Sequence, residues 1–510
     1  MTEIWREERM LIDGRLVAAS DGATYDNVNP ATEKVIGVAA DGTSTDMDAA
    51  ITAARHAFDH TDWADDLAFR VRCIRQLHEA LTKHADELRA STVAEVGCPV
   101  ALTYGPQLDA PLAGLPWVAD LAETYHWETS LGFAEPFGMR THRTVRREPV
   151  GVVGAITPWN YPVQINLAKV VPALAAGNTV VLKPAPDTPY GATLLGQVIA
   201  EHTDIPAGVV NVVTSAGHAV GQQLCEDPRV DMISFTGSTA TGTRIMTAAA
   251  ATIKKVFLEL GGKSALVALD DADIDAVVTS AAFATTTHAG QGCANTTRLL
   301  LPRNKYRDGV AALAETLKTW PYGDPTDSSV LMGPLIREEQ RQRVLGYIRK
   351  GVEEGATIAV GGGIPAHLST GYYVEPTVLA DVDPDSTVAQ DEIFGPVLVV
   401  IPHDGDDHAV EIANNSRYGL SGTVVSASDE RARAVANRMR TGTVSDTPLP
   451  DGGAGNGLAR RTSWTARLSR VPLPLDPTTR TPVTRPPSRK IPVTVQFWMI
   501  STPRLSAARA

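Results

Sequence analysis

The chain has 510 residues, 43% of them hydrophobic and 5% aromatic, which is enough for two or three domains with sizeable cores. Residues 1–446 contain 36 Lys/Arg and 56 Asp/Glu, whereas residues 447–510 contain 10 Lys/Arg and 2 Asp/Glu. An acidic body argues against nucleic acid as a partner, and no apolar run reaches the roughly 18 residues of a membrane span. MTEIWREERM is not a secretory signal, and the four widely spaced cysteines form no zinc pattern. We therefore expect a cytoplasmic protein with reduced thiols, no metal site and no membrane partner.

The first 150 residues predict short strands, then helices, then a hairpin. MLIDGRLVAAS and TYDNVNPATEKVIGVAA alternate β-type runs with turns. DMDAAITAARHAF has apolar residues at helical spacing, and Ser44 or Thr45 would cap that helix. FRVRCIRQLHEALTKH and ELRASTVAEVG predict two further amphipathic helices. GFAEPFGMRTHRTVRREPVG predicts a protruding hairpin whose exposed edges need a partner.

From Val150 onward, short β-branched runs alternate with helical segments. The runs are VGVVGAI, NTVVLKPA, GVVNVVTS, DMISFTGS and KVFLELGG. This alternation is typical of βαβ units and of a parallel sheet buried on both faces. Such sheets bind ligands beyond the carboxyl ends of their strands, where the chain has Asn160, Lys183, Gly237, Ser238 and Glu259. A second α/β stretch begins at about Ser264.

Two glycine turns and one lysine are candidates for binding a dinucleotide. FTGSTATG places Gly237 and Ser238 between a strand and a helix, where backbone N–H groups and the helix N-terminus can hold a pyrophosphate. SAGHAVG, with Gly217 and Gly221, is a second such turn, although turns of this kind often only connect elements. Lys183 follows a buried strand, so it is either a solvated lysine or a ligand of ribose or phosphate.

Three further residues have the chemistry of a catalytic site. Asn160 lies between two prolines in PWNYP, and a rigidly held amide can donate to a developing oxyanion, although turn asparagines are common. Glu259, in LELGGKS, is either a buried structural carboxylate or a general base. Cys293, in HAGQGCAN, is flanked by small residues that leave its thiol approachable, as a nucleophile requires. Each residue is ambiguous alone, but together they provide a nucleophile, an oxyanion donor and a base.

Six motifs occur in the order and spacing of the aldehyde dehydrogenase superfamily: PWNYP, VLKPA, FTGST, LELGGKS, GQGCAN and EIFGP. The chain resembles that family from about Leu11 to Val444. The resemblance implies an α/β fold with a Rossmann-type cofactor-binding domain (1–128 and 150–261), an oligomerisation hairpin (129–149) and an α/β catalytic domain (262–444). It also implies a homodimer or homotetramer.

The resemblance assigns roles to the matching positions. Cys293 would attack an aldehyde carbonyl, its backbone N–H and the Asn160 side chain would hold the oxyanion, and Glu259 would activate the water that hydrolyses the resulting thioester. NAD(P) would accept the hydride. Lys183 and Glu392 would bind the two riboses and Ser238 a phosphate, while Trp159 and Phe394 would line the cofactor site.

The chain departs from the family pattern in two places that bear on function. Pro186 stands where many members have a glutamate that binds the adenosine ribose hydroxyls. Its loss removes a carboxylate that would repel a 2′-phosphate, so NADP stays open, although we expect NAD. Residues 445–510 form a basic tail rich in Pro and Arg in place of the family's FGGxKxSGxGRE segment and final strand. We hypothesise a reading-frame shift near Ser445. Two alternatives to aldehyde oxidation remain. The altered ending is compatible with a catalytically silent binding or structural protein, and the family also includes CoA-acylating enzymes, which transfer the thioester to CoA instead of water.

Overall fold

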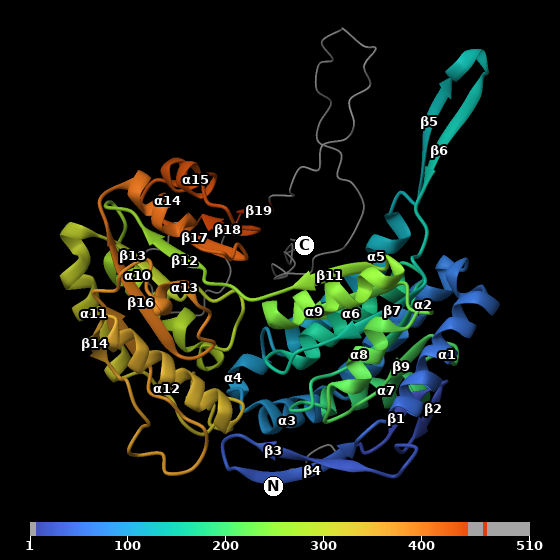
Figure 1. Ribbon diagram of the computed structural model, residues 1–510, viewed down its shortest axis with the longest axis horizontal. Coiled ribbons are helices and arrows are strands. Elements are labelled where there is room, and N and C mark those ends of the chain that lie inside the picture. The colour runs from blue at the N-terminus through green and yellow to red at the C-terminus, as the bar shows by residue number, and fades with distance from the viewer. Residues whose placement is uncertain (1–6, 447–462, 467–510) are drawn as a thin grey trace, which may run out of the picture.

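The computed structural model describes residues 7–446 and 463–466 (Figure 1). Two large sheets lie side by side, each covered by helices, and one hairpin projects away from the body (Figure 1). Most of the predicted basic tail therefore lies outside the described residues. Within those residues, no helix combines the length and apolarity needed to cross a membrane.

The first sheet has the strand order β11-β10-β7-β8-β9-β1-β2. Its five parallel strands are the β-branched runs predicted from the sequence: β7 (Val152–Ile156), β8 (Thr179–Lys183), β9 (Val210–Val212), β10 (Met232–Thr236) and β11 (Lys255–Glu259). β1 (Met10–Ile12) and β2 (Arg15–Val17) extend it antiparallel. The strand order reverses between β7 and β10, and in open α/β sheets ligands bind at such a point.

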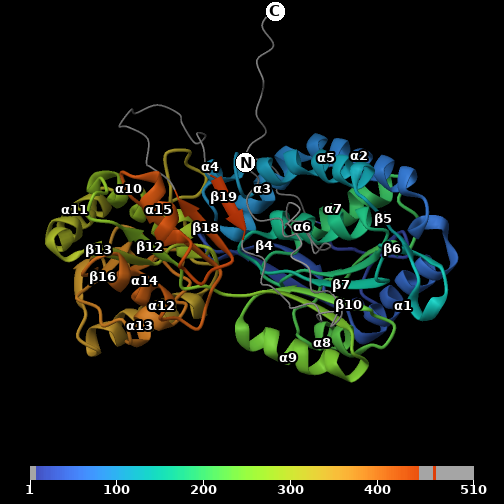
Figure 2. The ribbon, with the colours of Figure 1, turned by 90° about the horizontal axis from the view of Figure 1, so that it is seen from above.

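Helices cover both faces of this sheet (Figure 2), so its central strands β7, β8 and β9 are buried, whereas the edge strands β11 and β2 are partly exposed. One face packs against α2 (Leu67–Lys83), α5 (Asp109–Thr124), α6 (Pro162–Ala175) and α7 (Tyr190–His202). The other packs against α1 (Ser44–His60), α8 (Ala219–Glu226) and α9 (Thr239–Ala249). α3 (Ala85–Val96) contacts α7 and the hairpin of β3 (Thr24–Asn29) and β4 (Lys34–Ala40), and the short α4 (Val100–Thr103) follows it.

The N-terminus of α1 differs from the prediction. Thr43, not Ser44 or Thr45, is the N-cap, and its side chain accepts hydrogen bonds from the first-turn amides while Asp46 bonds back to the Thr43 N–H. The reason is that a carboxylate three residues after the cap completes a reciprocal capping box.

The second sheet has the strand order β14-β15-β16-β13-β12-β17-β18-β19. Its strands are β12 (Ala265–Ala268), β13 (Arg298–Pro302), β14 (Thr357–Val360), β15 (Thr377–Ala380), β16 (Val397–His403), β17 (Ser421–Val425), β18 (Thr443–Asp446) and β19 (Ser463–Ala466). α10 (Ile274–Thr286) and α11 (Tyr306–Lys318) cover one face. The helices α12 (Glu338–Glu353), α13 (Thr387–Gln390), α14 (Asp406–Asn414) and α15 (Asp429–Ala436) cover the other.

The predicted hairpin and the described part of the predicted basic tail both lie at the periphery of the structure. The hairpin consists of β5 (Glu128–Ala134) and β6 (Thr141–Arg146) and protrudes as predicted (Figure 1). In the predicted tail, β19 pairs antiparallel with β18, which itself lies parallel to β17. This edge of the second sheet therefore ends on a strand drawn from the basic segment.

Candidate functional site

The candidate site lies where the chain passes from the first sheet to the second. β11 ends at Glu259, residues 260–264 form the connection, and β12 begins at Ala265 (Figure 1). Asn160 follows β7 and Ser238 follows β10, both at the carboxyl ends of strands of the first sheet. Cys293 lies in the loop before β13 of the second sheet. The site therefore combines residues from both sheets.

An unusual backbone precedes Cys293. His288, Ala289 and Gly290 all have left-handed φ angles, of 51°, 53° and 72°. A side chain at Gly290 would collide with the backbone carbonyl of Gly395, and one at Gly292 would collide with the Asn295 side chain. Left-handed φ is unfavourable for His and Ala, so the surrounding structure must hold this turn in place.

Gln291 provides much of that restraint. Its buried amide donates to the carbonyls of His288 (3.1 Å) and Pro334 (3.3 Å) and accepts from the N–H of Ile336 at 2.9 Å. These bonds fix the loop against the segment before α12. The residue was not among those singled out from the sequence, because a glutamine within a turn carries no local signal.

The connection 260–264 packs tightly against this loop. A Cβ atom on Gly262 would lie 2.5 Å from the carbonyl oxygen of Cys293, and one on Gly261 would collide with the carboxylate of Glu392. The two glycines of LELGGKS are therefore required by close approach. Gly262 N–H also donates to Glu392 Oε1 at 3.0 Å, which holds that carboxylate beside the connection.

The Cys293 thiol is held largely in its neutral form. Burial, together with the charges of Glu392 and Glu259, raises its pKa to about 12, although the backbone N–H groups of Cys293 and Ala294 act in the opposite direction. Both carboxylates are thus close enough to act electrostatically on the sulfur. Since the thiolate is the nucleophile, this environment requires something else at the site to favour ionisation.

Asn160 is buried and tethered at both ends. Its side-chain Nδ2 donates to the Gln291 carbonyl at 2.8 Å, and its own backbone carbonyl accepts from Gln107 Nε2 at 2.9 Å. An amide nitrogen carries two hydrogens, so the bond to Gln291 leaves one for a ligand. Asn160 thereby links the first sheet to the loop that carries Cys293.

Glu259 is buried at the end of β11, where its backbone carbonyl accepts the N–H of Gly237 at 3.0 Å. Lys169, on α6, is near it. Burial lowers the pKa of that ammonium to about 7, while the Glu259 charge acts in the opposite direction. Lys169 Nζ donates to Ser234 Oγ at 3.0 Å. A buried lysine therefore lies near Glu259, in addition to the two carboxylates of the site.

The phosphate-binding candidates sit at the starts of α9 and α8. Ser238 is the N-cap of α9, where its hydroxyl accepts from the Thr241 amide. The Gly237 N–H is already bonded to Glu259, so an anion here would meet the first turn of α9 beyond it. Gly217 precedes α8 and Gly221 lies in its first turn.

Lys183, at the end of β8, packs its stem against Gly221, since a Cβ there would lie 3.6 Å from Lys183 Cδ. Its ammonium is buried and makes two long hydrogen bonds, to the carbonyls of Pro184 (3.3 Å) and Ser215 (3.4 Å). Burial lowers its pKa to about 8, against the attraction of two nearby aspartates. A donor held this loosely is available to a ligand.

Trp159 and Phe394 come together although 235 positions separate them in the sequence. Their ring centroids are 5.3 Å apart and the planes are inclined at 86°, an edge-to-face contact. Phe394 has a left-handed φ of 61°, and the preceding Glu392 has a raised pKa because of burial. The structure thus brings an aromatic surface and a carboxylate to the same end of the site.

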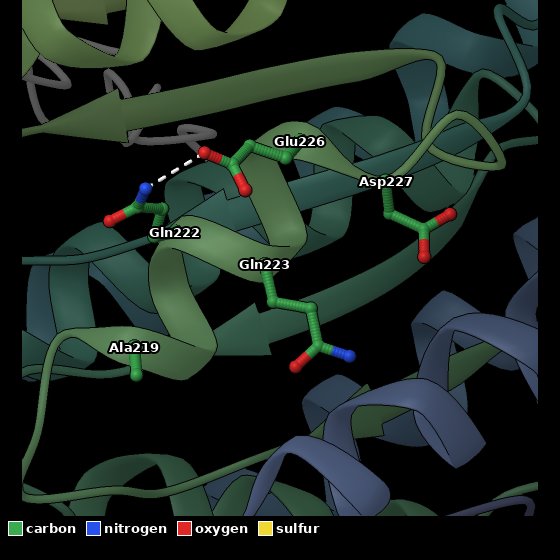
Figure 3. Close-up of a pocket in the computed structure, with 5 residues that line it drawn as sticks. All are labelled: Ala219, Gln222, Gln223, Glu226 and Asp227. Atoms are coloured by element: carbon green, nitrogen blue, oxygen red, sulfur yellow. Dashed lines mark hydrogen bonds between the residues drawn. The ribbon is translucent and has the colours of Figure 1, made fainter.

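A separate open depression lies on α8 (Figure 3). It has a volume of about 360 Å³ and is lined by Ala219, Gln222, Gln223, Glu226 and Asp227. Gln222 Nε2 donates to Glu226 Oε1 at 2.8 Å across its rim (Figure 3). It contains none of the candidate catalytic residues, and its short polar lining offers no enclosed surface for a ligand.

Comparison with known proteins identifies the family. Residues 17–447 match the profile of the aldehyde dehydrogenase family. A 3-succinoylsemialdehyde-pyridine dehydrogenase from a Pseudomonas species is 42% identical over 459 residues, covering 88% of this chain and 94% of that protein. The geranial dehydrogenase of Castellaniella defragrans is 38% identical over 461 residues, covering 89% of this chain and 95% of that protein.

Solved structures of aldehyde dehydrogenases share the fold of this chain. An aldehyde dehydrogenase from Mycobacterium tuberculosis in complex with NAD+ has a TM-score of 0.83 at 39% identity, covering 86% of this chain and 90% of that one. A mutant of aldehyde dehydrogenase C from Pseudomonas syringae, in complex with NAD+ and octanal, has a TM-score of 0.81 at 37% identity, covering 86% and 88%. The chain belongs to the aldehyde dehydrogenase family, which confirms the predicted family and fold. The matched region ends at residue 447, where the sequence departs from the family pattern.

Proposed function

We propose that this chain oxidises an aldehyde to a carboxylic acid with NAD as the hydride acceptor, using Cys293 as the nucleophile. One observation carries the proposal: Asn160 is tied through the Gln291 carbonyl to the loop of Cys293, while the charge of Glu259 reaches the same thiol. An amide donor, a carboxylate and a thiol therefore converge where the two sheets meet. The relatives with bound NAD+ support the choice of cofactor.

The residues present fit a dinucleotide. Lys183 offers a loosely bonded buried ammonium, Ser238 begins a helix whose N-terminus attracts a phosphate, and Glu392 is a carboxylate suited to ribose hydroxyls. Trp159 and Phe394 provide aromatic surface for a flat ring. Gly217, Gly221 and Gly237 lie at the starts of α8 and α9, where a phosphate would bind. NAD, when bound, supplies a hydride acceptor and a positive charge.

The protein's own residues carry the remaining chemistry. The Cys293 thiolate adds to the aldehyde carbon, and the resulting oxyanion accepts hydrogen bonds from Asn160 Nδ2 and the Cys293 backbone N–H. Loss of hydride from that carbon leaves a thioester on Cys293. Glu259 then takes a proton from water, whose oxygen adds to the thioester carbon, and the acid leaves as the C–S bond breaks and Cys293 is regenerated.

The proposal also covers the domains of the chain, its oligomeric state and its cellular location. The residues proposed as a cofactor-binding domain (1–128 and 150–261) contain the first sheet, and those proposed as a catalytic domain (262–444) contain most of the second. The hairpin exposes large apolar side chains, at Leu131 (55%), Phe133 (63%), Phe137 (98%) and Met139 (63%). Apolar surface of this kind suits burial against another copy, so we propose a homodimer or homotetramer, in the cytoplasm.

The test is NADH formation from an aldehyde panel, measured by absorbance for the wild type and for Cys293→Ala. Octanal, geranial and a pyridine-bearing semialdehyde belong in the panel because the relatives are named for, or hold, such compounds. NAD-dependent turnover by the wild type alone is expected. NAD binding without turnover would favour the silent protein, and turnover only with added CoA would favour the acylating enzyme.

A further inference from the structure

Gln107 lies far from the catalytic motifs in sequence but contacts the oxyanion residue directly. It sits in the turn between α4 and α5 and is completely buried. Its Nε2 donates to the backbone carbonyl of Asn160 at 2.9 Å, across 53 positions of the chain. No motif includes this residue, and the proposed mechanism does not use it.

The Asn160 carbonyl belongs to the peptide plane that follows the residue, so a bond to it sets the backbone torsion ψ at Asn160. That torsion controls the direction in which the side chain leaves the backbone. At the other end, Nδ2 is held by the Gln291 carbonyl at 2.8 Å. With both ends tethered, the remaining Nδ2 hydrogen has a fixed direction, which oxyanion stabilisation requires.

The other half of the Gln107 side chain adds no hydrogen bond to the described part of the chain. Its Oε1 is buried and has no hydrogen-bond partner among the described residues. A buried acceptor without a partner destabilises the folded state, and an apolar side chain of the same shape would remove that cost. A residue present only for packing at this position would not need an amide.

We propose that Gln107 is a positioning residue that orients the Asn160 amide toward the oxyanion. The inference rests on the proposed function. Gln107 does not touch the reacting atoms; it acts only through the Asn160 peptide. Its removal therefore weakens the step in which negative charge develops on the substrate oxygen, and leaves the cofactor contacts of Lys183 and Glu392 intact.

The variant Gln107→Met keeps the side-chain length and removes the amide. It removes the Gln107 bond to the Asn160 carbonyl but also removes the buried Oε1, so the two effects on stability act in opposite directions. We expect the unfolding midpoint to shift by less than about 2 °C, the Kd for NAD to be unchanged, and kcat/KM for the aldehyde to fall about 10-fold. Gln107→Asn, whose amide is too short to reach, should show the same loss. As a matched control, Gln76→Met removes an amide on α2 that bonds Asp204, and it should leave the Kd for NAD and kcat/KM unchanged.

A double-mutant cycle with Asn160→Ala decides whether Gln107 acts through Asn160. Asn160→Ala alone should lower kcat/KM by about 100-fold or more, and adding Gln107→Met should lower it no further. Normal turnover by Gln107→Met, or a second loss that multiplies with that of Asn160→Ala, would overturn the inference. Failure of the wild type to form NADH would instead overturn the proposed function.

Discussion

The neutral state of the Cys293 thiol predicts how the free enzyme responds to an alkylating reagent. With its pKa raised to about 12 by burial and by two carboxylates, a fraction of about 1 in 10,000 is thiolate at pH 8, against about a quarter for a cysteine of ordinary pKa. Iodoacetamide reacts with the thiolate. Without cofactor, the rate of alkylation at Cys293 should therefore rise about tenfold per pH unit from pH 7 to 9 without levelling off.

The assay is labelling at fixed reagent concentration, quenched at intervals and quantified by peptide mass spectrometry. Cys73, Cys98 and Cys225 are buried, so they should stay unlabelled in the folded chain. Cys293→Ala should abolish the labelling. A rate that begins to level off between pH 8 and 9 would refute the reasoning, because it would mean that the thiol ionises at an ordinary pKa or below despite its surroundings.

The same assay separates the causes of the shift. Glu392→Gln removes one of the two charges that oppose ionisation, and labelling at pH 8 should rise by roughly 3- to 10-fold. The increase stays modest because burial, the larger cause, is unchanged. Glu79→Gln, on the exposed side of α2, is the matched control and should leave the rate unchanged.

Three other substitutions test the surroundings of the site. Gly262→Ala should give a folded protein with kcat/KM lowered at least about 100-fold, measured by NADH formation, because the new Cβ would meet the Cys293 carbonyl at 2.5 Å and displace the nucleophile; activity near the wild-type value would contradict this. Arg298→Met should lower the unfolding free energy by about 2–4 kcal/mol in urea titrations, because its buried guanidinium donates to four backbone carbonyls; an unchanged midpoint would count against it. Burial raises the pKa of Glu95 from 4.5 to about 8. Between these pH values the folded state holds a proton that the unfolded state has released. The unfolding free energy should therefore fall by up to about 1.4 kcal/mol for each unit by which the pH rises. Glu95→Gln should lack this contribution in thermal melts from pH 5 to 8, and parallel pH profiles would disprove the assignment.

The sequence was sufficient to predict the elements that carry the site. Runs of β-branched residues predicted the parallel strands, and because such strands end at one edge of a sheet, Asn160 and Glu259 could be placed at that edge before the structure was known. The cap of α1 was predicted wrongly because Ser44 and Thr45 are equally good capping types. What decides for Thr43 is the position of Asp46, three residues on.

Other features depend on contacts that no local pattern records. Gln107 reaches Asn160 across 53 positions, and Gln291 anchors its loop through residues of another segment. The sequence provided no reason for the glycine pair of LELGGKS, whereas in the structure Gly261 and Gly262 are required because Glu392 and the Cys293 carbonyl lie against them. Such requirements arise from three-dimensional packing, so a single sequence does not reveal them.

The connection between the two sheets, residues 260–264, is a position at which the chain could be split into two parts. Every strand of the first sheet precedes this connection and every strand of the second follows it. A protein cut there would yield one piece with the amide and the carboxylate and another with the thiol, each retaining a whole sheet. Neither piece could complete a turnover alone, so recovered activity would show that the two pieces had associated. The chain is therefore a suitable starting point for a split-enzyme sensor of association.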